Sequence, residues 1–323
     1  MLRPLRAGRR FVTTSALAFV LAFVRVVMSA ASIQPSAGLM AAADADADAA
    51  AYESAEAPGE PAQRASLKAA AATSPNIPLN FDTEAEQTLL ELANQARAQA
   101  GAPRLALDAG MSRAARTHAE AMFAARQLSH QFDGEASLPQ RLAAASRTQL
   151  DQEGENVATD LDAERGHQHL MLSPPHRANL LNPAYNLVGV GVVRGGDRLY
   201  IVQDFGHALP TYSLAEVKDR IAAIVAQTRR QTKQPAFARR DLPTADAAAC
   251  SMAQADKLGT SPVHQLAQRY TVLAYTSLRP ETLPDGAYRL FGSHVLRSFS
   301  VGACYGRSET YPSGAYWVVL SLD

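Results

Sequence analysis

The sequence predicts an α+β protein in which helices surround a β-hairpin, followed by a smaller α+β module. Apolar residues recur at helical spacing in several segments between residues 83 and 171. Residues 187–193 and 199–205 are apolar, strand-like runs joined by the turn Gly195-Gly196-Asp197. After Pro210, one amphipathic helix and further strand-like runs indicate a separate module.

The first thirty residues have the pattern of an export signal. Four arginines precede an apolar run at 11–28, and small residues follow at 29–31, so we expect a signal peptide at residues 1–31. Arg25 interrupts the apolar run, and an uncleaved membrane anchor is the alternative. The expected location is secreted, periplasmic or cell-surface, with membrane contact only if the segment stays uncleaved.

Residues 32–80 are rich in alanine and poor in large apolar side chains, and we interpret them as a disordered linker. Order is expected from Phe81 to His207. The first predicted element is a helix that begins near Asp82 or Thr83 and ends at Gly101, followed by an extended link at 103–107 and a second helix from Asp108 or Ser112. A short helix at 139–145 and a turn at Gly154 come next. A helix through His169 to Met171, a short helix after His176 and the hairpin complete this region.

Beyond residue 207 we expect a helix and connector at 208–243 and an α+β module at 244–323. An amphipathic helix is predicted at 214–230 and another at 247–258. Strand-like runs lie at 270–275, 287–291, 301–305 and 315–322. The sequence shows no internal repeat.

The chain has two cysteines, Cys250 on the predicted helix and Cys304 on a predicted strand. They form either a disulfide or two buried free thiols, and the export signal favours the disulfide. No cysteine–histidine spacing typical of a structural zinc site is present.

Composition and motifs exclude several functions. The formal net charge is zero and the pI is about 7.1, which argues against a nucleic-acid partner. HExxH is absent, because His118-Ala119-Glu120 has no second histidine in the required place. GxSxG is absent as well, so the motifs favour no common hydrolase.

Three residues are the candidates for a site: His130, Glu155 and His176. Imidazole can bind a metal or move a proton near neutral pH, and a carboxylate can bind a metal, accept a proton or bond backbone amides. His118 falls on an apolar helical stripe and is interpreted as a buried, hydrogen-bonded core histidine. His167 and His169 are two residues apart on a helix, so they point to different faces.

Two pieces of the sequence are specific when taken together, in this order and spacing: Gly154-Glu155-Asn156-Val157-Ala158 and Ser173-Pro174-Pro175-His176-Arg177-Ala178-Asn179-Leu180-Leu181-Asn182-Pro183. The supporting pieces are Leu92-Ala93-Asn94-Gln95-Ala96-Arg97, Leu128-Ser129-His130 and Val202-Gln203-Asp204-Phe205-Gly206. With these pieces, residues 81–207 resemble bacterial-type CAP domains, the superfamily of cysteine-rich secretory proteins, antigen 5 and pathogenesis-related 1.

The resemblance implies an α-β-α sandwich with a large open cleft. In it, His130 and His176 are the two family histidines, and Glu155 is the first acidic residue. Such clefts hold a divalent metal, often zinc, and His130 and His176 are the expected ligands. A second acidic residue is expected near Leu172 and Ser173, and none is present there. Structural support is expected from His118, Asn156, Arg177 and Asn179.

Family members usually act by binding lipids, sterols, glycans or protein partners. We therefore expect an exported, non-catalytic binding protein with a lipid, glycan, protein or metal ligand. One alternative is a zinc-dependent hydrolase or protease that uses His130, His176 and Glu155, with Glu155 as its base. Another is a cell-envelope adhesion or structural protein in which the C-terminal module does the work.

Overall fold

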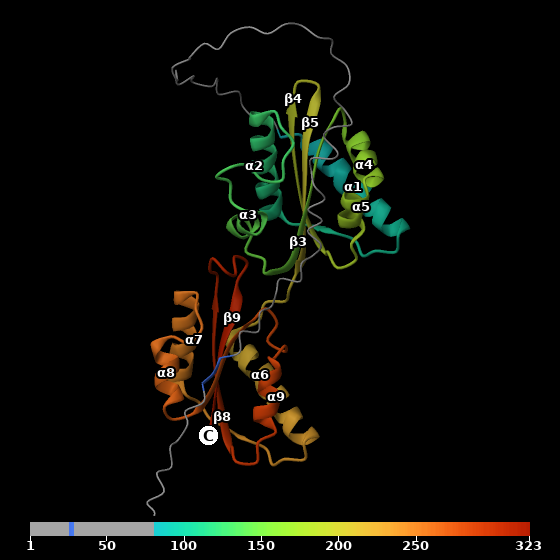
Figure 1. Cartoon of the computed structure of the whole chain (residues 1–323). Coiled ribbons are helices and arrows are strands. Elements are labelled where there is room, and N and C mark those ends of the chain that lie inside the picture. The colour runs from blue at the N-terminus through green and yellow to red at the C-terminus, as the bar shows by residue number, and fades with distance from the viewer. Residues whose placement is uncertain (1–25, 29–80) are drawn as a thin grey trace, which may run out of the picture.

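The computed structural model describes residues 26–28 and 81–323. These residues form two α+β units, each with a sheet between helical layers (Figure 1). The expected signal peptide and linker lie outside the described residues, apart from Val26–Met28 (β1), whose backbone pairs in parallel with a strand of the second unit. None of the helices in the described part has the length and hydropathy to cross a membrane.

The first unit has a four-stranded sheet in the order β2-β4-β5-β3, with α2 and α3 on one face and α1, α4 and α5 on the other (Figure 1). Its β2–β4 pair is parallel, and its other pairs are antiparallel. The elements are α1 (Thr83–Gln99), β2 (Ala106–Leu107), α2 (Ala109–Ala125), α3 (Leu138–Ala145), β3 (Leu150–Asp160), α4 (Ala163–Leu172), α5 (Pro174–Leu181), β4 (Leu187–Gly195) and β5 (Arg198–Ala208).

Local capping explains where the helices of the first unit begin. The Asp82 carboxylate accepts from the amide of Ala85, and Asp108 accepts in the same way from Met111. Ser137 caps α3 in a reciprocal capping box. Pro174 opens α5 at a position where no amide donor is needed.

The segment around Gly154 differs from the prediction. We expected a turn there, and the structure shows the middle of strand β3, which pairs with β5 along its length. In this register Glu155 lies opposite Asp204 and Val157 opposite Val202. A glycine beside polar residues is a local turn signal, but the ladder to β5 makes the backbone extended.

The second unit has the order β7-β9-β8-β6, with β1 outside β7. Its elements are α6 (Leu214–Gln231), β6 (Ala238–Arg239), α7 (Pro243–Ala255), α8 (Ser261–Ala267), β7 (Thr271–Ser277), α9 (Asp285–Phe291), β8 (Ser298–Gly306) and β9 (Ala315–Leu322). Helix α6, expected in a connector, packs through Val217, Ile221 and Val225 into the same core as β8 and β9. It is therefore structurally part of this unit.

The predicted strand at 287–291 was wrong, because these residues belong to helix α9. Ala287 and Phe291 lie one helical turn apart, and both are fully buried in the core beside α6. Five residues without a clear period leave helix and strand undecided, and here packing against α6 selects the helix.

The two units repeat one topology that the sequence does not show. In each, a helix leads to a short strand in parallel with the first strand of a hairpin, and another strand flanks the hairpin on its far side. Helices α6 and α9 cover one face of the second sheet, and α7 and α8 cover the other, as α1, α4, α5 and α2, α3 do in the first (Figure 1).

One buried arginine near the end of the first helix of each unit supports this equivalence. Arg97 in α1 donates to the carbonyls of Pro103, Leu180, Asn182 and Tyr185. Arg229 in α6 donates to those of Pro235, Phe291 and Ser293. In both units the guanidinium ties the loop after its own helix to the segment before the hairpin.

The strand registers give the same alignment. Ala106 pairs with Leu187 in the first unit, and Ala238 pairs with Ser298 in the second. This alignment places Gly191 of β4 at the position of Gly302 of β8. A Cβ on Gly191 would lie 2.2 Å from the backbone nitrogen of Arg116 in α2, and one on Gly302 would lie 2.1 Å from the Ala245 carbonyl oxygen in α7. Both units therefore need glycine where the covering helix touches the hairpin.

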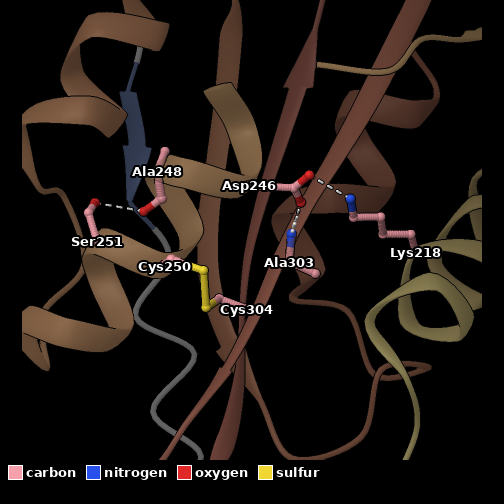
Figure 2. Close-up of a disulfide and its surroundings, with 7 residues drawn as sticks. All are labelled: Lys218, Asp246, Ala248, Cys250, Ser251, Ala303 and Cys304. Carbon is pink, nitrogen blue, oxygen red and sulfur yellow. Dashed lines mark hydrogen bonds and ion pairs between the residues drawn. A yellow bond between two sulfur atoms is a disulfide. The ribbon is translucent and has the colours of Figure 1, made fainter. Parts of the chain in front are cut away.

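The predicted disulfide is confirmed in the second unit. Cys250 of α7 is bonded to Cys304 of β8, with the Cα atoms 5.0 Å apart (Figure 2). Beside it, Asp246 accepts from the amide of Ala303 and pairs with Lys218 of α6 (Figure 2). The bond and these contacts fix α7 to the hairpin and to α6.

Candidate functional site

The first unit carries a charged cluster centred on Glu155 of β3. His130, in the loop after α2, donates from Nδ1 to Glu155 Oε1 at 2.9 Å, and Arg141 of α3 donates from Nη2 to Glu155 Oε2 at 2.5 Å. The Glu155 side chain is 4% exposed and that of His130 is 51% exposed. The carboxylate is thus buried between two cationic or donor groups, and the imidazole is its outward-facing member.

Arg141 also contacts the buried members of this cluster. Its Nη1 donates to Glu135 Oε1 at 2.8 Å and to the His130 carbonyl at 3.3 Å. His118 of α2 is fully buried, with Nε2 donating to the Ser129 carbonyl and Nδ1 2.7 Å from Glu135 Oε1. Burial alone would raise the pKa of Glu135, but the Phe132 amide, His118 and Arg141 together lower it.

A second carboxyl group lies beneath Glu155. Asp204 of β5 is opposite Glu155 in the strand register and is fully buried. Burial, followed by the charge of nearby Glu155, raises the pKa of Asp204 well above its usual range. The two carboxyl groups are adjacent in a dry site, which favours the protonated form of Asp204, while Glu155 is bonded to Arg141.

Helix α5 is tied to β3 by amide side chains next to Glu155. Asn156 donates to the His176 carbonyl at 3.1 Å, and Asn179 donates to the Glu155 carbonyl at 3.1 Å and to Asn156 Oδ1 at 3.0 Å. These bonds bring the half-buried His176, at the beginning of α5, to the same edge of the sheet. The pieces that carry the family resemblance therefore meet in space.

Other predicted residues are placed differently. Arg177 is exposed on α5, and its side chain donates no hydrogen bond to any described residue, so the tie to β3 that was expected of Arg177 and Asn179 is made by Asn179. His167 is buried, whereas His169 is exposed and lies 2.6 Å from Asp160 Oδ2, so this pair forms no joint site. Near Leu172 and Ser173 no acidic side chain takes the place of the missing one.

The arrangement does not fit a resident zinc ion. Within residues 26–28 and 81–323, no group of three or more histidine, cysteine, aspartate or glutamate side chains is placed to hold a metal. Both oxygens of Glu155 are already hydrogen-bonded, and burial together with Glu155 raises the pKa of Asp204, which makes Asp204 a poorer metal ligand. A zinc site normally needs three protein ligands with free lone pairs. Zinc binding stays a prediction.

A separate groove of about 690 Å³ lies between α1 and α4. Leu172, in its wall, is 79% exposed. His167 also lies in the wall, burial lowers its pKa, and its Nδ1 is buried without a hydrogen-bond partner among the described residues. The wall therefore mixes apolar and polar side chains; its residues are Leu92, Gln95, Ala96, Gln99, His167, Gln168, Met171 and Leu172.

Comparison with known families identifies the first unit. A model of the cysteine-rich secretory protein family, CAP, matches residues 90–205. These residues belong to that family, and the unit that contains them is a CAP domain with an α-β-α sandwich. No curated protein matches the chain.

Solved structures show similarities that are low overall. An outer surface protein of Borrelia burgdorferi is 19% identical, with 41% of this chain and 99% of that chain covered and a TM-score of 0.38. An extracellular, SCP-domain protein of Bacillus anthracis is 27% identical, with 39% and 41% covered and a TM-score of 0.36. Na-ASP-1 is 9% identical, with 77% and 90% covered and a TM-score of 0.41. The chain thus spans less than half of the Bacillus protein.

Sequence reasoning assigned no role to Glu135, Arg141 or Asp204, which complete the cluster. Asp204 was quoted as part of the resemblance, and an acid inside the apolar strand of residues 199–205 was a usable signal of a buried, functional carboxyl. Arg141 and Glu135 carried no comparable signal, because exposed helices and loops contain many such residues.

Proposed function

We propose that the CAP domain is a non-catalytic binding module of an exported protein and that His130 is the polar side chain that faces the ligand in its cleft. The observation that carries this is the arrangement of Glu155, which is buried with one oxygen on Arg141 and the other on His130. The exposed imidazole keeps Nε2 for a ligand.

The same arrangement disfavours Glu155 as a general base. A base must lie within hydrogen-bond reach of the proton that it removes, and both oxygens of Glu155 are already hydrogen-bonded, one to Arg141 and the other to His130. The zinc-dependent hydrolase with His130, His176 and Glu155 is therefore the weaker alternative.

A hydrolysis assay separates binding from catalysis. We expect the purified protein to cleave neither casein nor p-nitrophenyl acetate, with or without added zinc, and to bind no stoichiometric zinc by elemental analysis. The comparison uses Glu155→Gln, the double variant His130→Ala/His176→Ala, and His264→Ala, which removes an exposed histidine of the second unit. Zinc-dependent turnover that Glu155→Gln and the double variant lose, and His264→Ala keeps, would overturn the proposal.

The groove between α1 and α4 favours a lipid as the ligand class. Its apolar side chains suit an acyl chain, and the glutamines beside them suit a polar head group. We expect cis-parinaric acid to bind the purified protein and Leu172→Glu to weaken that binding. Val295→Glu, which changes an exposed apolar side chain of the second unit, is the matched control. Equal binding by all three proteins would remove the groove from the proposal.

Export and surface location are part of this proposal, supported by the pattern of residues 1–31. If the protein instead serves envelope adhesion through its second unit, removal of the residues after Pro210 should abolish cell-surface retention. We expect retention to survive that truncation, provided that the truncated CAP domain is recovered folded by circular dichroism.

A further inference from the structure

The contacts between the two units fall on the elements that carry the charged cluster. Arg307, just after β8, donates from Nη1 to the Ala143 carbonyl at 2.6 Å and from Nη2 to the Ser146 carbonyl at 3.0 Å. These carbonyls are at the C-terminal end of α3, where a helix leaves acceptors without intrahelical partners and favours a cation. The second unit therefore caps α3.

The beginning of β3 is held in the same way. Gln149 donates to the carbonyls of Leu278 and Gly314, both at 3.2 Å. Asp151 pairs with Arg279 at 2.5 Å. These residues of the second unit come from the segment after β7 and the turn before β9, so two segments of the second unit contact the beginning of β3.

Both elements that the second unit contacts, α3 and β3, carry residues of the charged cluster. Arg141 lies on α3, half a turn before Ala143, and Glu155 lies on β3 after Asp151. Helix α3 has only eight residues, and a short helix depends on tertiary contacts for its position. The bond from Arg141 to Glu155 thus spans two elements whose ends are both anchored in the second unit.

The second unit has no charged side chain at the positions aligned with Glu155 and Asp204. In the alignment of the two registers, the positions of Glu155 and Asp204 are taken by Val272 and Ser321, which lie opposite each other in β7 and β9. Val272 packs in an apolar cluster with Ala245, Ala248 and Val319. The second unit therefore does not repeat the Glu155–Asp204 chemistry of the first.

We propose that the second unit positions the cleft of the CAP domain: Arg307 is a positioning residue that acts through α3 to set the Arg141–Glu155 pair and, with it, the orientation of His130. The inference rests on the proposed function, because the residues that it positions are those of the binding cleft. Its test needs no ligand, so a failure to find a ligand and a failure of the positioning are separate results.

The test records the imidazole NMR signals of His130 in the full chain, assigned by their loss in His130→Ala. Arg307→Gln removes the donor fork, and Arg307→Lys keeps one cationic donor. The matched control is Arg289→Gln, which changes an exposed arginine of α9 that donates no hydrogen bond to a described residue. Arg141→Lys, which replaces the guanidinium that donates to both Glu135 and Glu155, shows how the signals respond when the Arg141–Glu155 pair itself changes.

We expect Arg307→Gln to shift the His130 signals in the direction seen for Arg141→Lys, Arg307→Lys to restore part of the shift, and Arg289→Gln to match wild type. Arg307 is exposed, so its variants should fold, and circular dichroism checks this. His130 signals in Arg307→Gln that overlay those of wild type would overturn the inference. A shift of equal size in Arg289→Gln would do the same.

Discussion

In the CAP domain, β3 and β5 bring Glu155 and Asp204 opposite each other, whereas at the aligned positions of the second unit Val272 lies opposite Ser321. Around these positions the first unit places Arg141, Glu135 and two histidines. The second unit places apolar side chains there and adds a disulfide. The two units therefore share their strand order and register but differ in the side chains at these aligned positions.

This difference shows that the frame does not depend on the cleft residues. Arg97 and Arg229, and the tight contacts at Gly191 and Gly302, are present in both units and lie away from the charged cluster. They hold helices to the hairpin whether the side chains at the aligned positions are charged or apolar. The chemistry of each unit therefore depends on a few positions placed on a shared frame.

The largest expected effect comes from removing the shared arginines. Arg97→Met and Arg229→Met should each lower the free energy of unfolding of their own unit by about 5 kcal/mol, because each buried carbonyl left without a donor costs about 1–3 kcal/mol. Hydrogen exchange measured by mass spectrometry during urea denaturation reports the unfolding of each unit separately. Loss of amide protection in the wrong unit would contradict the equivalence.

The next largest effect is expected from the Arg141–Glu155 pair of the first unit. Arg141→Ala leaves Glu155 buried without its cation and should cost about 3–5 kcal/mol. The double variant Arg141→Met/Glu155→Gln removes both charges and should recover part of that loss. Equilibrium denaturation in urea measures both. If the double variant is no more stable than Arg141→Ala, the cost comes from lost packing and not from an unpaired charge.

The disulfide should affect only the second unit. Cys250→Ala/Cys304→Ala is expected to lower its stability by about 2–4 kcal/mol, since the open chain gains entropy when unfolded. Thermal unfolding of the variant should resemble that of wild type in dithiothreitol. Hydrogen exchange within the CAP domain is expected to stay unchanged, and faster exchange there would show that the units unfold together.

The smallest effect concerns pH. The folded-state pKa of Asp204 is raised by burial and by Glu155, so its stabilising contribution is full below the unfolded pKa of about 3.9 and is lost as pH rises through the folded pKa. The loss is about 1.4 kcal/mol for each pH unit between the two values. Asp204→Asn should lack this dependence.

Urea midpoints between pH 4 and pH 8 measure the effect. Burial also raises the pKa of Glu153 and gives a slope of the same sign, so the informative quantity is the difference between wild type and Asp204→Asn. Parallel pH profiles would mean that Asp204 is charged in the folded protein.

Local sequence signals were sufficient for most of the first unit. The helices that begin near Asp82 and Asp108 and the hairpin at Gly195-Gly196 follow from rules that involve only neighbouring residues. The short helix was predicted to begin after His176, and it begins at Pro174, so that His176 lies inside it. The strand at Gly154 and helix α9 did not follow, because each takes its conformation from a distant partner, β5 for the strand and α6 for the helix.

The site divides in the same way. The sequence by itself determined the candidate residues His130, Glu155 and His176, the two units and the Cys250–Cys304 pair, because motif order and cysteine count are properties of the chain. Only the tertiary structure decided that Arg141 and Asp204 surround Glu155, that the second unit repeats the first, and that it anchors α3 and β3. The physical reason is that strand register and the reach of a guanidinium join residues far apart in sequence, and no local pattern records those pairings.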